Sequence, residues 1–254
     1  MIKIGGSTLG QHDTTLEDLV WLQDSGVEAV VVHGGGKTIT EWLERQKVPT
    51  RFANGLRVTD EESIGVVVAV LAGLVNKQLV SQINALGGRA LGLSGADAGI
   101  VRAQIRDQAL GLVGHPSSVH PEAIEILLAG GFLPVLSPIG VLEENGKVTG
   151  TLLNINADTV AAAVGGGVRA QELLFFTDVP GVRGDDGQVI PVLNKTRALE
   201  LIKSGTISGG MIPKVEACLL ALEYVPATQV LDGRQPHVLR DYVTGKRTGT
   251  AIAA

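Results

Sequence analysis

Short apolar runs alternate with amphipathic segments along this chain. Each run predicts a buried strand, because a strand covered on both faces is apolar at every position. The runs lie at 29–32, 90–93, 132–136, 173–176 and 228–231. Between them, the spacing of apolar residues predicts helices, for example at 39–46 and 121–128. This alternation predicts an α/β fold with a mostly parallel sheet, and segments 101–114 and 140–151 are predicted as hairpins added to one end.

Three glycines at 34–36 follow the run at 29–32 and precede a predicted helix. Without Cβ atoms, such a loop lets phosphate or carboxylate oxygens approach backbone N–H groups at a helix start. Lys37 fits the end of a P-loop signature, but that signature needs a glycine where Val31 stands, and the dinucleotide fingerprint fails at Ile39. The loop predicts a bound anion without naming it; the alternative is a plain strand-to-helix turn.

Two lysines and one aspartate are the charged candidates for a functional site. Lys3 interrupts a short apolar strand, which is costly unless the lysine is paired or lies at a sheet edge. Lys214 falls in the first turn of a predicted helix, where it opposes the helix dipole and favours a nearby anion. Asp158 follows Asn156 at another helix start; the dipole alone explains its place there, and a functional role requires a cation nearby.

Arg57 lies just after the Asn-Gly centre of a hairpin predicted over 51–58. Thr59 and Glu62 have the spacing of a capping box that opens a long helix. The hairpin is therefore predicted to hold Arg57 at a helix entrance, with a solvated surface arginine as the alternative.

Composition narrows the possible partners. The net charge is −5, no basic run is present and only 3% of residues are aromatic, so nucleic acid is a poor candidate. The single Cys218 excludes an internal disulfide framework and a cysteine metal cluster, and is predicted to pack in the core. No uninterrupted apolar run approaches 18 residues, and the sequence does not open with a basic segment followed by an apolar one, as a signal peptide does. We therefore expect a soluble cytoplasmic protein without a membrane span.

Six segments together resemble motifs of the amino-acid kinase family. They are Lys3-Ile4-Gly5-Gly6, His33-Gly34-Gly35-Gly36, Asn54-Gly55-Leu56-Arg57-Val58-Thr59, Asn154-Ile155-Asn156-Ala157-Asp158, Thr177-Asp178-Val179-Pro180-Gly181 and Gly209-Gly210-Met211-Ile212-Pro213-Lys214. They follow the order of the family and span almost the whole chain. Each motif alone is weak, but their joint occurrence is highly specific.

The resemblance implies a three-layer αβα sandwich around a mostly parallel sheet. It implies one domain, 1–254, with an acceptor-binding lobe at 1–169 and a nucleotide-binding lobe at 170–254. The implied enzyme is a phosphotransferase with a carboxyl group as acceptor. It transfers a phosphoryl group from ATP to the side-chain carboxylate of N-acetyl-L-glutamate, an early step of arginine biosynthesis.

The same resemblance implies a role for each matching residue. Lys3 and Lys214 are the catalytic cations, and Asp158 holds both in place. The acceptor is bound by Gly34, Gly35, Arg57 and Asn154. The phosphoryl groups and the nucleotide are bound by Gly5, Gly6, Thr177, Asp178, Val179, Gly181, Val182, Gly210 and Met211.

This set of residues suits the implied chemistry. A carboxylate acceptor is already ionised at neutral pH, because its reference pKa is about 4, so no general base is needed. Phosphoryl transfer then depends on positioning and on cations. Mg²⁺ is expected to bridge the phosphates of ATP, and no metal site made by the protein alone is predicted.

The resemblance also carries expectations about assembly and rivals. Arginine-inhibited relatives have an additional N-terminal helix, whereas only Met1 and Ile2 precede Lys3 in this sequence. We therefore expect a homodimer that lacks this mode of inhibition by arginine. The segment 248–250 leaves residual arginine sensitivity open. One rival is a kinase acting on glutamate or aminoadipate attached to a small acidic carrier protein, which needs a basic rim. Another is a non-catalytic metabolite-sensing binder. The failed fingerprint disfavours a dehydrogenase.

Overall fold

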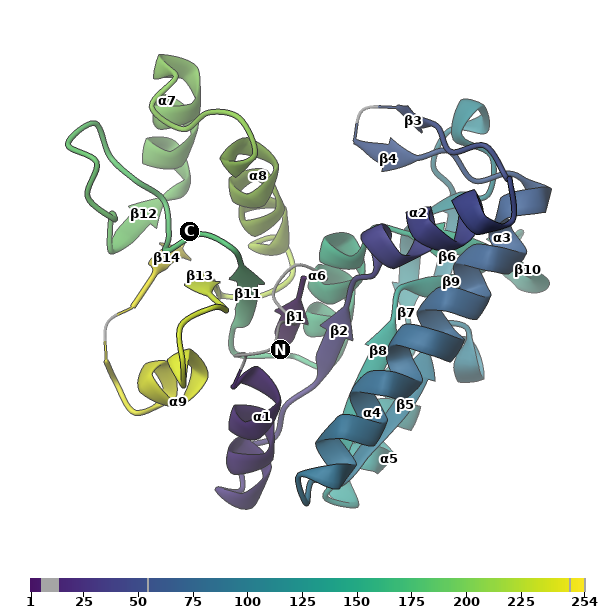
Figure 1. Ribbon diagram of the computed structural model, residues 1–254, viewed down its shortest axis with the longest axis horizontal. Coiled ribbons are helices and arrows are strands. Elements are labelled where there is room, and N and C mark those ends of the chain that lie inside the picture. Colours follow the sequence, from purple (N-terminus) through teal and green to yellow (C-terminus); the bar gives the residue numbers. More distant parts are fainter. Residues whose placement is uncertain (6–13, 54, 247, 254) are drawn as a thin grey trace.

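The protein is described by a computed structural model that covers residues 1–5, 14–53, 55–246 and 248–253. Its centre is an eight-stranded sheet with the order β12-β14-β13-β11-β1-β2-β8-β5 (Figure 1). These strands are β1 (Ile2–Ile4), β2 (Val31–His33), β5 (Ala90–Ser94), β8 (Leu133–Ser137), β11 (Leu173–Thr177), β12 (Val192–Asn194), β13 (Ala227–Asp232) and β14 (Thr250–Ala253). All neighbours pair in parallel except β13 and β14, which are antiparallel. The predicted mostly parallel sheet is confirmed.

Helices cover both faces of this sheet. They are α1 (Thr15–Asp24), α2 (Gly36–Arg45), α3 (Glu61–Val68), α4 (Asn76–Ala85), α5 (Glu122–Ala129), α6 (Ala157–Gly167), α7 (Lys195–Ser204), α8 (Met211–Ala221) and α9 (Val238–Val243), with short 3₁₀ turns at Asp97–Gly99 and Gln108–Leu110. Alternate strand residues enter different cores: Val32 and Phe175 pack with α6 and α8, whereas Val31 and Phe176 pack with α1, α4 and α9. The three-layer αβα sandwich is confirmed.

The central position of β1 excludes a sheet edge as the reason why Lys3 is tolerated there. Ile2 and Ile4 point into the core beside α1, so the intervening Lys3 points to the opposite face, which α6 covers. β1 pairs with β2 on one side and with β11 on the other, so Lys3 is not at a sheet edge.

The predicted hairpins form a separate small barrel. β6 (Val101–Ile105) pairs antiparallel with β7 (Val113–Val119), and β9 (Ile139–Glu144) pairs antiparallel with β10 (Lys147–Ile155). Parallel pairing of β6 with β9 and of β7 with β10 closes the four strands into a barrel. The barrel and the short hairpin of β3 (Phe52–Ala53) and β4 (Leu56–Arg57) lie on the same side of the molecule in Figure 1.

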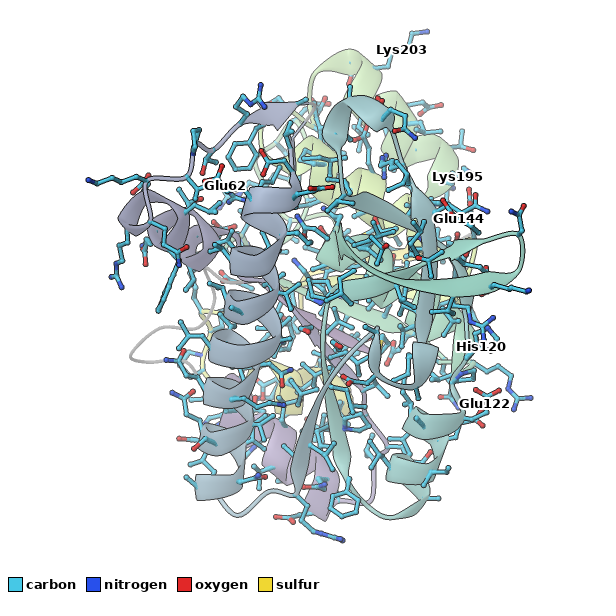
Figure 2. All side chains as sticks on the ribbon, turned by 90° about the vertical axis from the view of Figure 1, so that its right-hand side faces the viewer. Glu62, His120, Glu122, Glu144, Lys195 and Lys203 are labelled. Atoms are coloured by element: carbon cyan, nitrogen blue, oxygen red, sulfur yellow. The ribbon has the colours of Figure 1, made fainter. Side chains whose placement is uncertain are left out.

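A continuous helix from Glu61 to Ala85 joins α3 and α4 through a π-helical segment, Ala69–Val75. The predicted capping box is wrong by one residue: Asp60 caps the helix by accepting from the Ser63 N–H, and the Ser63 hydroxyl accepts from the Asp60 N–H. By length and composition this 25-residue helix could also cross a membrane. Here it packs on β5, β8 and α2 as a core helix does, and it runs along the near face in Figure 2.

Candidate functional site

Residues from Lys3 in the first strand to Asp158 at the start of α6 line a cavity of about 220 Å³ at the carboxyl ends of β1 and β2. Its wall includes Lys3, the glycines at 34–36, Arg57, Asn154 and Asp158. Ligands bind at this edge of open α/β sheets because loops and helix N-termini converge there. The fold therefore brings the predicted acceptor residues together with two of the three predicted catalytic residues.

Lys3 and Asp158 form an ion pair inside this cavity. Lys3 Nζ lies 2.8 Å from Asp158 Oδ1, and the two side chains are 16% and 30% exposed. Asn156 fixes the carboxylate's position, because its side-chain oxygen accepts from the Asp158 N–H (2.8 Å) and caps α6. The ammonium thus has its compensating charge and still faces the cavity.

The glycine loop forms another part of the wall of this cavity. Gly34 N–H donates to Ile4 O (3.0 Å), which anchors the loop to β1, and Gly35 is the N-cap residue of α2. Gly34, Gly35 and Gly36 all line the cavity. The start of α2 therefore offers backbone N–H donors toward any anion held there.

Arg57 is buried beside the same loop, with only 8% of its surface exposed. Its Nη2 donates to Gly36 O (2.9 Å) and to Thr40 Oγ1 (2.7 Å), and its guanidinium lies 4.7 Å from the Phe52 ring centroid. Burial lowers the pKa of Arg57 from its usual value. The prediction of a held arginine is confirmed, and the solvated alternative is wrong.

Asn154 reaches the cavity from the end of β10. Its Nδ2 donates to Thr59 Oγ1 (3.0 Å), and the Thr59 hydroxyl donates to Arg57 O (3.1 Å). This chain of hydrogen bonds orients Asn154 and ties it to the hairpin that carries Arg57. Thr59 was predicted only as a helix cap; its role as a support between the two acceptor residues has no signal in the sequence.

Lys214 lies in the first turn of α8 and contacts a different aspartate from the implied one. Its Nζ donates to Asp178 Oδ1, and this hydrogen bond holds the pKa of the Asp178 carboxyl below its usual value. In this structure Asp158 pairs with Lys3 and Lys214 pairs with Asp178, whereas the resemblance implied that Asp158 holds both lysines. Across a cavity of about 570 Å³, Asp158 faces Pro213 and Glu216 of α8.

The other predicted nucleotide residues surround the carboxyl end of β11. Thr177 ends the strand, Asp178 and Val179 follow it, Gly181 has a φ of +142°, and Gly210 and Met211 begin α8. Val182 is fully buried and its N–H donates to Thr250 Oγ1 (2.8 Å), so neither its side chain nor its N–H is open to a ligand. Gly5 directly follows β1, and Gly6 lies outside the described residues.

A second charged pair at this edge was missed by the sequence reasoning. Arg234 binds Asp232 through two hydrogen bonds of 2.8 Å, from Nε and from Nη2. In the sheet register Asp232 lies beside Thr177. The hydrogen bond with Asp232 raises the pKa of Arg234, and the negative charge of Asp178 also contributes to raising it. The available signal was the position of Asp232 at the carboxyl end of a predicted parallel strand, followed by glycine and arginine.

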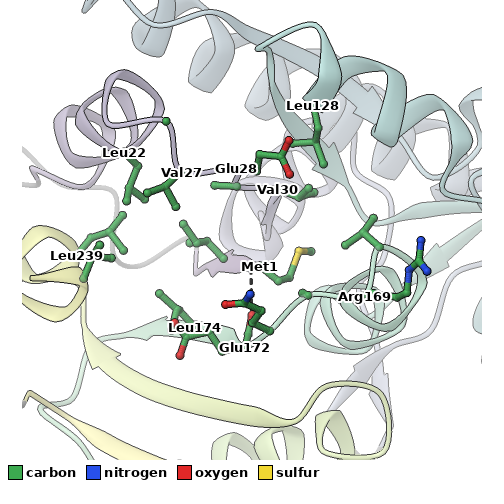
Figure 3. A pocket seen from close by; sticks show the side chains of 17 residues that line it. Met1, Leu22, Val27, Glu28, Val30, Leu128, Arg169, Glu172, Leu174 and Leu239 are labelled. Carbon is green, nitrogen blue, oxygen red and sulfur yellow. Dashed lines mark hydrogen bonds between the residues drawn. The ribbon is translucent and has the colours of Figure 1, made fainter. Parts of the chain in front are cut away.

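A larger cavity, of about 550 Å³, opens at the opposite edge of the sheet (Figure 3). It lies near the amino ends of β1, β2 and β11, and mostly aliphatic side chains surround it, among them Leu22, Val30 and Leu174. Its charged members, Glu28, Arg169 and Glu172, do not form an ion pair with one another among the described residues. The chemistry of the smaller cavity, with its paired charges and glycine loop, makes it the candidate site.

Comparison with known proteins gives one family and several full-length relatives. The model of the amino acid kinase family matches residues 1–229. The acetylglutamate kinase of Dehalococcoides mccartyi strain BAV1 is 40% identical over 99% of this chain and 93% of its own length. That of Rhodopseudomonas palustris strain CGA009 is 43% identical over 99% of this chain and 89% of its own length.

Solved structures share the fold. The smu.665 protein of Streptococcus mutans UA159 superposes with a TM-score of 0.81 at 31% identity, over 100% of this chain and 97% of that one. A Giardia lamblia carbamate kinase has a TM-score of 0.72 at 14% identity, over 99% and 96%. An N-acetylglutamate synthase from Neisseria gonorrhoeae, complexed with coenzyme A and N-acetyl-glutamate, has a TM-score of 0.82 at 22% identity, over 100% and 58%.

Proposed function

Because the chain belongs to the amino acid kinase family, we propose that it phosphorylates the side-chain carboxylate of N-acetyl-L-glutamate with ATP, as a step of arginine biosynthesis. The observation that carries this proposal is the convergence of Lys3, the glycine loop, Arg57 and Asn154 on one cavity. Such a cavity suits an acceptor with two carboxylates, one to be held and one to react.

The geometry supports a division of labour between the two ends of the acceptor. Arg57 and Asn154 bind the α-carboxylate, because a buried arginine and an amide supported by Thr59 form a fixed set of donors. The reacting carboxylate then lies toward Lys3 and the start of α2. There the ammonium and the backbone N–H group of Gly35 face the negative charge of the phosphoryl group.

The nucleotide is proposed to lie over the lobe at 170–254, with the acceptor over 1–169. Lys214, at the start of α8, is placed to neutralise charge on the donor phosphates, and Asp178 holds its ammonium ready. Mg²⁺ enters with the phosphates of ATP, as part of the substrate. Among the described residues, no group of three His, Cys, Asp or Glu side chains gathers as a metal cage.

The proposed reaction is tested by a coupled assay of ADP release with N-acetyl-L-glutamate as the acceptor, with and without arginine. We expect ADP release that depends on the acceptor, and a hydroxamate on trapping the acyl phosphate with hydroxylamine. Activity only on a glutamate or aminoadipate attached to a carrier protein would replace the proposal by that rival. Tight binding of both substrates without turnover would indicate a metabolite sensor instead.

Replacing Arg57 by alanine is expected to raise the KM for N-acetyl-L-glutamate by roughly 10- to 100-fold, because one charge-assisted pair with a carboxylate is lost. The KM for ATP stays within about twofold, since Arg57 is on the acceptor wall. Initial rates over a matrix of both substrates measure the two constants. An unchanged acceptor KM contradicts the assigned contact.

The family likeness also supports a proposal about assembly and location. We propose that the chain forms a homodimer and works in the cytoplasm. The open edge of the sheet at β5 and the exposed Ile126 on α5, which packs on the adjacent strand β8, support an interface on that side of the molecule.

A further inference from the structure

A fully buried histidine stands directly before the glycine loop. His33 ends β2 and has no exposed surface. Its Nδ1 lies 2.9 Å from Gly34 O, and its Nε2 lies 3.2 Å from Nδ2 of Asn76, which is also fully buried. Neither side chain lines the candidate cavity, so either can act on a bound substrate only through the loop.

The partners of the imidazole fix its tautomer. Gly34 O can only accept a hydrogen bond, so Nδ1 must carry the proton and donate. The amide of Asn76 is oriented by its other contacts: Nδ2 donates to Val135 O (2.9 Å) and Oδ1 accepts from Lys77 Nζ (3.0 Å). Nδ2 is therefore the group that faces the ring. One of its two hydrogens goes to Val135 O, and the other goes to Nε2 (3.2 Å), which lies closer than Leu93 O (3.4 Å).

The surroundings keep this ring neutral. Burial lowers the pKa of His33 to about 4, and the nearby charge of Lys77 acts in the same direction. A second proton on Nε2 would face the N–H groups of Asn76 and have no acceptor. The neutral ring thus accepts a hydrogen bond from Asn76 at Nε2 and donates one to the loop from Nδ1.

The donated hydrogen bond sets the direction of one peptide group. In a trans peptide the C=O and the next N–H point in opposite directions, so a Gly34 carbonyl held toward His33 turns the Gly35 N–H away from the ring. Gly35 belongs to the cavity wall, and within the described part of the chain no hydrogen bond occupies its N–H. A peptide flip would remove this donor from the cavity.

The π-helical segment places the other end of this link. Asn76 is the first residue after Ala69–Val75, and Leu71 of that segment packs so closely on the loop that a Cβ on Gly35 would lie 2.7 Å from Leu71 Cδ2. π-Helical turns inside α-helices shift the residues that follow and occur frequently at functional sites. The wide turn thus backs the glycine loop and also delivers Asn76 to His33.

We propose that His33, supported by Asn76, is a positioning residue that holds the Gly34–Gly35 peptide with its N–H aimed at the transferred phosphoryl group. This inference rests on the proposed kinase function. His33 acts only through the loop, so its loss weakens stabilisation of the transition state and leaves the binding of either substrate nearly unchanged.

Two variants of His33 distinguish the roles of the two ring nitrogens. In His33→Asn the amide nitrogen takes the place of Nδ1 and keeps the donor to Gly34 O, whereas in His33→Gln the amide takes the place of Nε2 and that donor is lost. We expect His33→Gln to lower kcat by roughly 10- to 100-fold with both KM values within about threefold. His33→Asn should retain most of the wild-type kcat, and the exposed His115→Gln should change nothing.

The inference has a readout that does not depend on turnover. Imidazole ¹⁵N shifts of the wild-type protein are expected to report a protonated Nδ1 and an unprotonated Nε2 on His33 from pH 8 down to about 5. An Nε2–H tautomer, equal kcat values for the two variants, or a change in KM alone would overturn the inference. If His33→Gln does not fold, Asn76→Ser tests the same link through its other partner. Wild-type protein without turnover contradicts the proposed function instead, whereas the tautomer remains measurable.

Discussion

Replacing Lys3 by methionine is expected to lower kcat by roughly 10²- to 10³-fold, the scale of losing one preorganised charge contact in a transition state. Methionine keeps most of the side chain's length and apolar stem, so the packing between β1 and α6 is preserved. The variant leaves the Asp158 carboxylate without its 2.8 Å partner, beside the incoming phosphoryl group. The unpaired carboxylate then repels the phosphoryl group where the ammonium attracted it. We expect both KM values to change far less than kcat.

Steady-state rates, together with equilibrium binding of each substrate, measure this effect. Lys37→Met is the matched control, because Lys37 is an exposed lysine directly after the glycine loop and is the lysine that a P-loop interpretation would select. We expect wild-type rates for the control. A large loss in Lys37→Met with little loss in Lys3→Met would reverse the assignment of the catalytic lysine.

Lys214→Ala is expected to lower kcat by about 10²-fold or more, because α8 then presents no cation to the donor phosphates. The pKa of the Asp178 carboxyl should return toward its usual range, since the Lys214 hydrogen bond is the main cause of its depression. At neutral pH the carboxylate remains ionised and now repels the nucleotide, so the KM for ATP should rise as well.

Lys203→Ala provides the comparison for this second lysine. Lys203 projects from the far end of α7 into solvent (Figure 2), and its loss changes the net charge by the same amount. Full turnover by Lys214→Ala would contradict the assigned role. A loss in kcat that Lys214→Arg largely restores would support it, because arginine supplies the charge from a similar position.

The sheet could be predicted largely because its strands are buried on both faces. Runs such as 173–176 and 228–231 became β11 and β13 with boundaries within one residue. The barrel could not be foreseen in the same way. Each hairpin is a local pairing that its turn specifies, whereas β6–β9 and β7–β10 are long-range pairings without a local signal.

The sequence singled out residues that the structure brings close together, but it did not predict all of their contacts. Lys3 and Lys214 could be singled out because a lysine inside an apolar strand or at a helix start needs compensation. Which aspartate compensates Lys214 depends on where α8 packs relative to β11, and the structure gives Asp178. The link from Asn76 to His33 was invisible because it depends on a π-helical turn, which no apolar periodicity indicates.

The pairing of β1 with β11 has a consequence for synthesis on the ribosome. Met1 N and Glu172 O, which meet at the start of this pairing, are 171 positions apart in the chain. A nascent chain therefore leaves one edge of β1 unpaired until β11 has emerged, and the strand that carries Lys3 cannot gain its second neighbour earlier. Pairings of such high contact order form slowly, so completion of the site is a late event of folding.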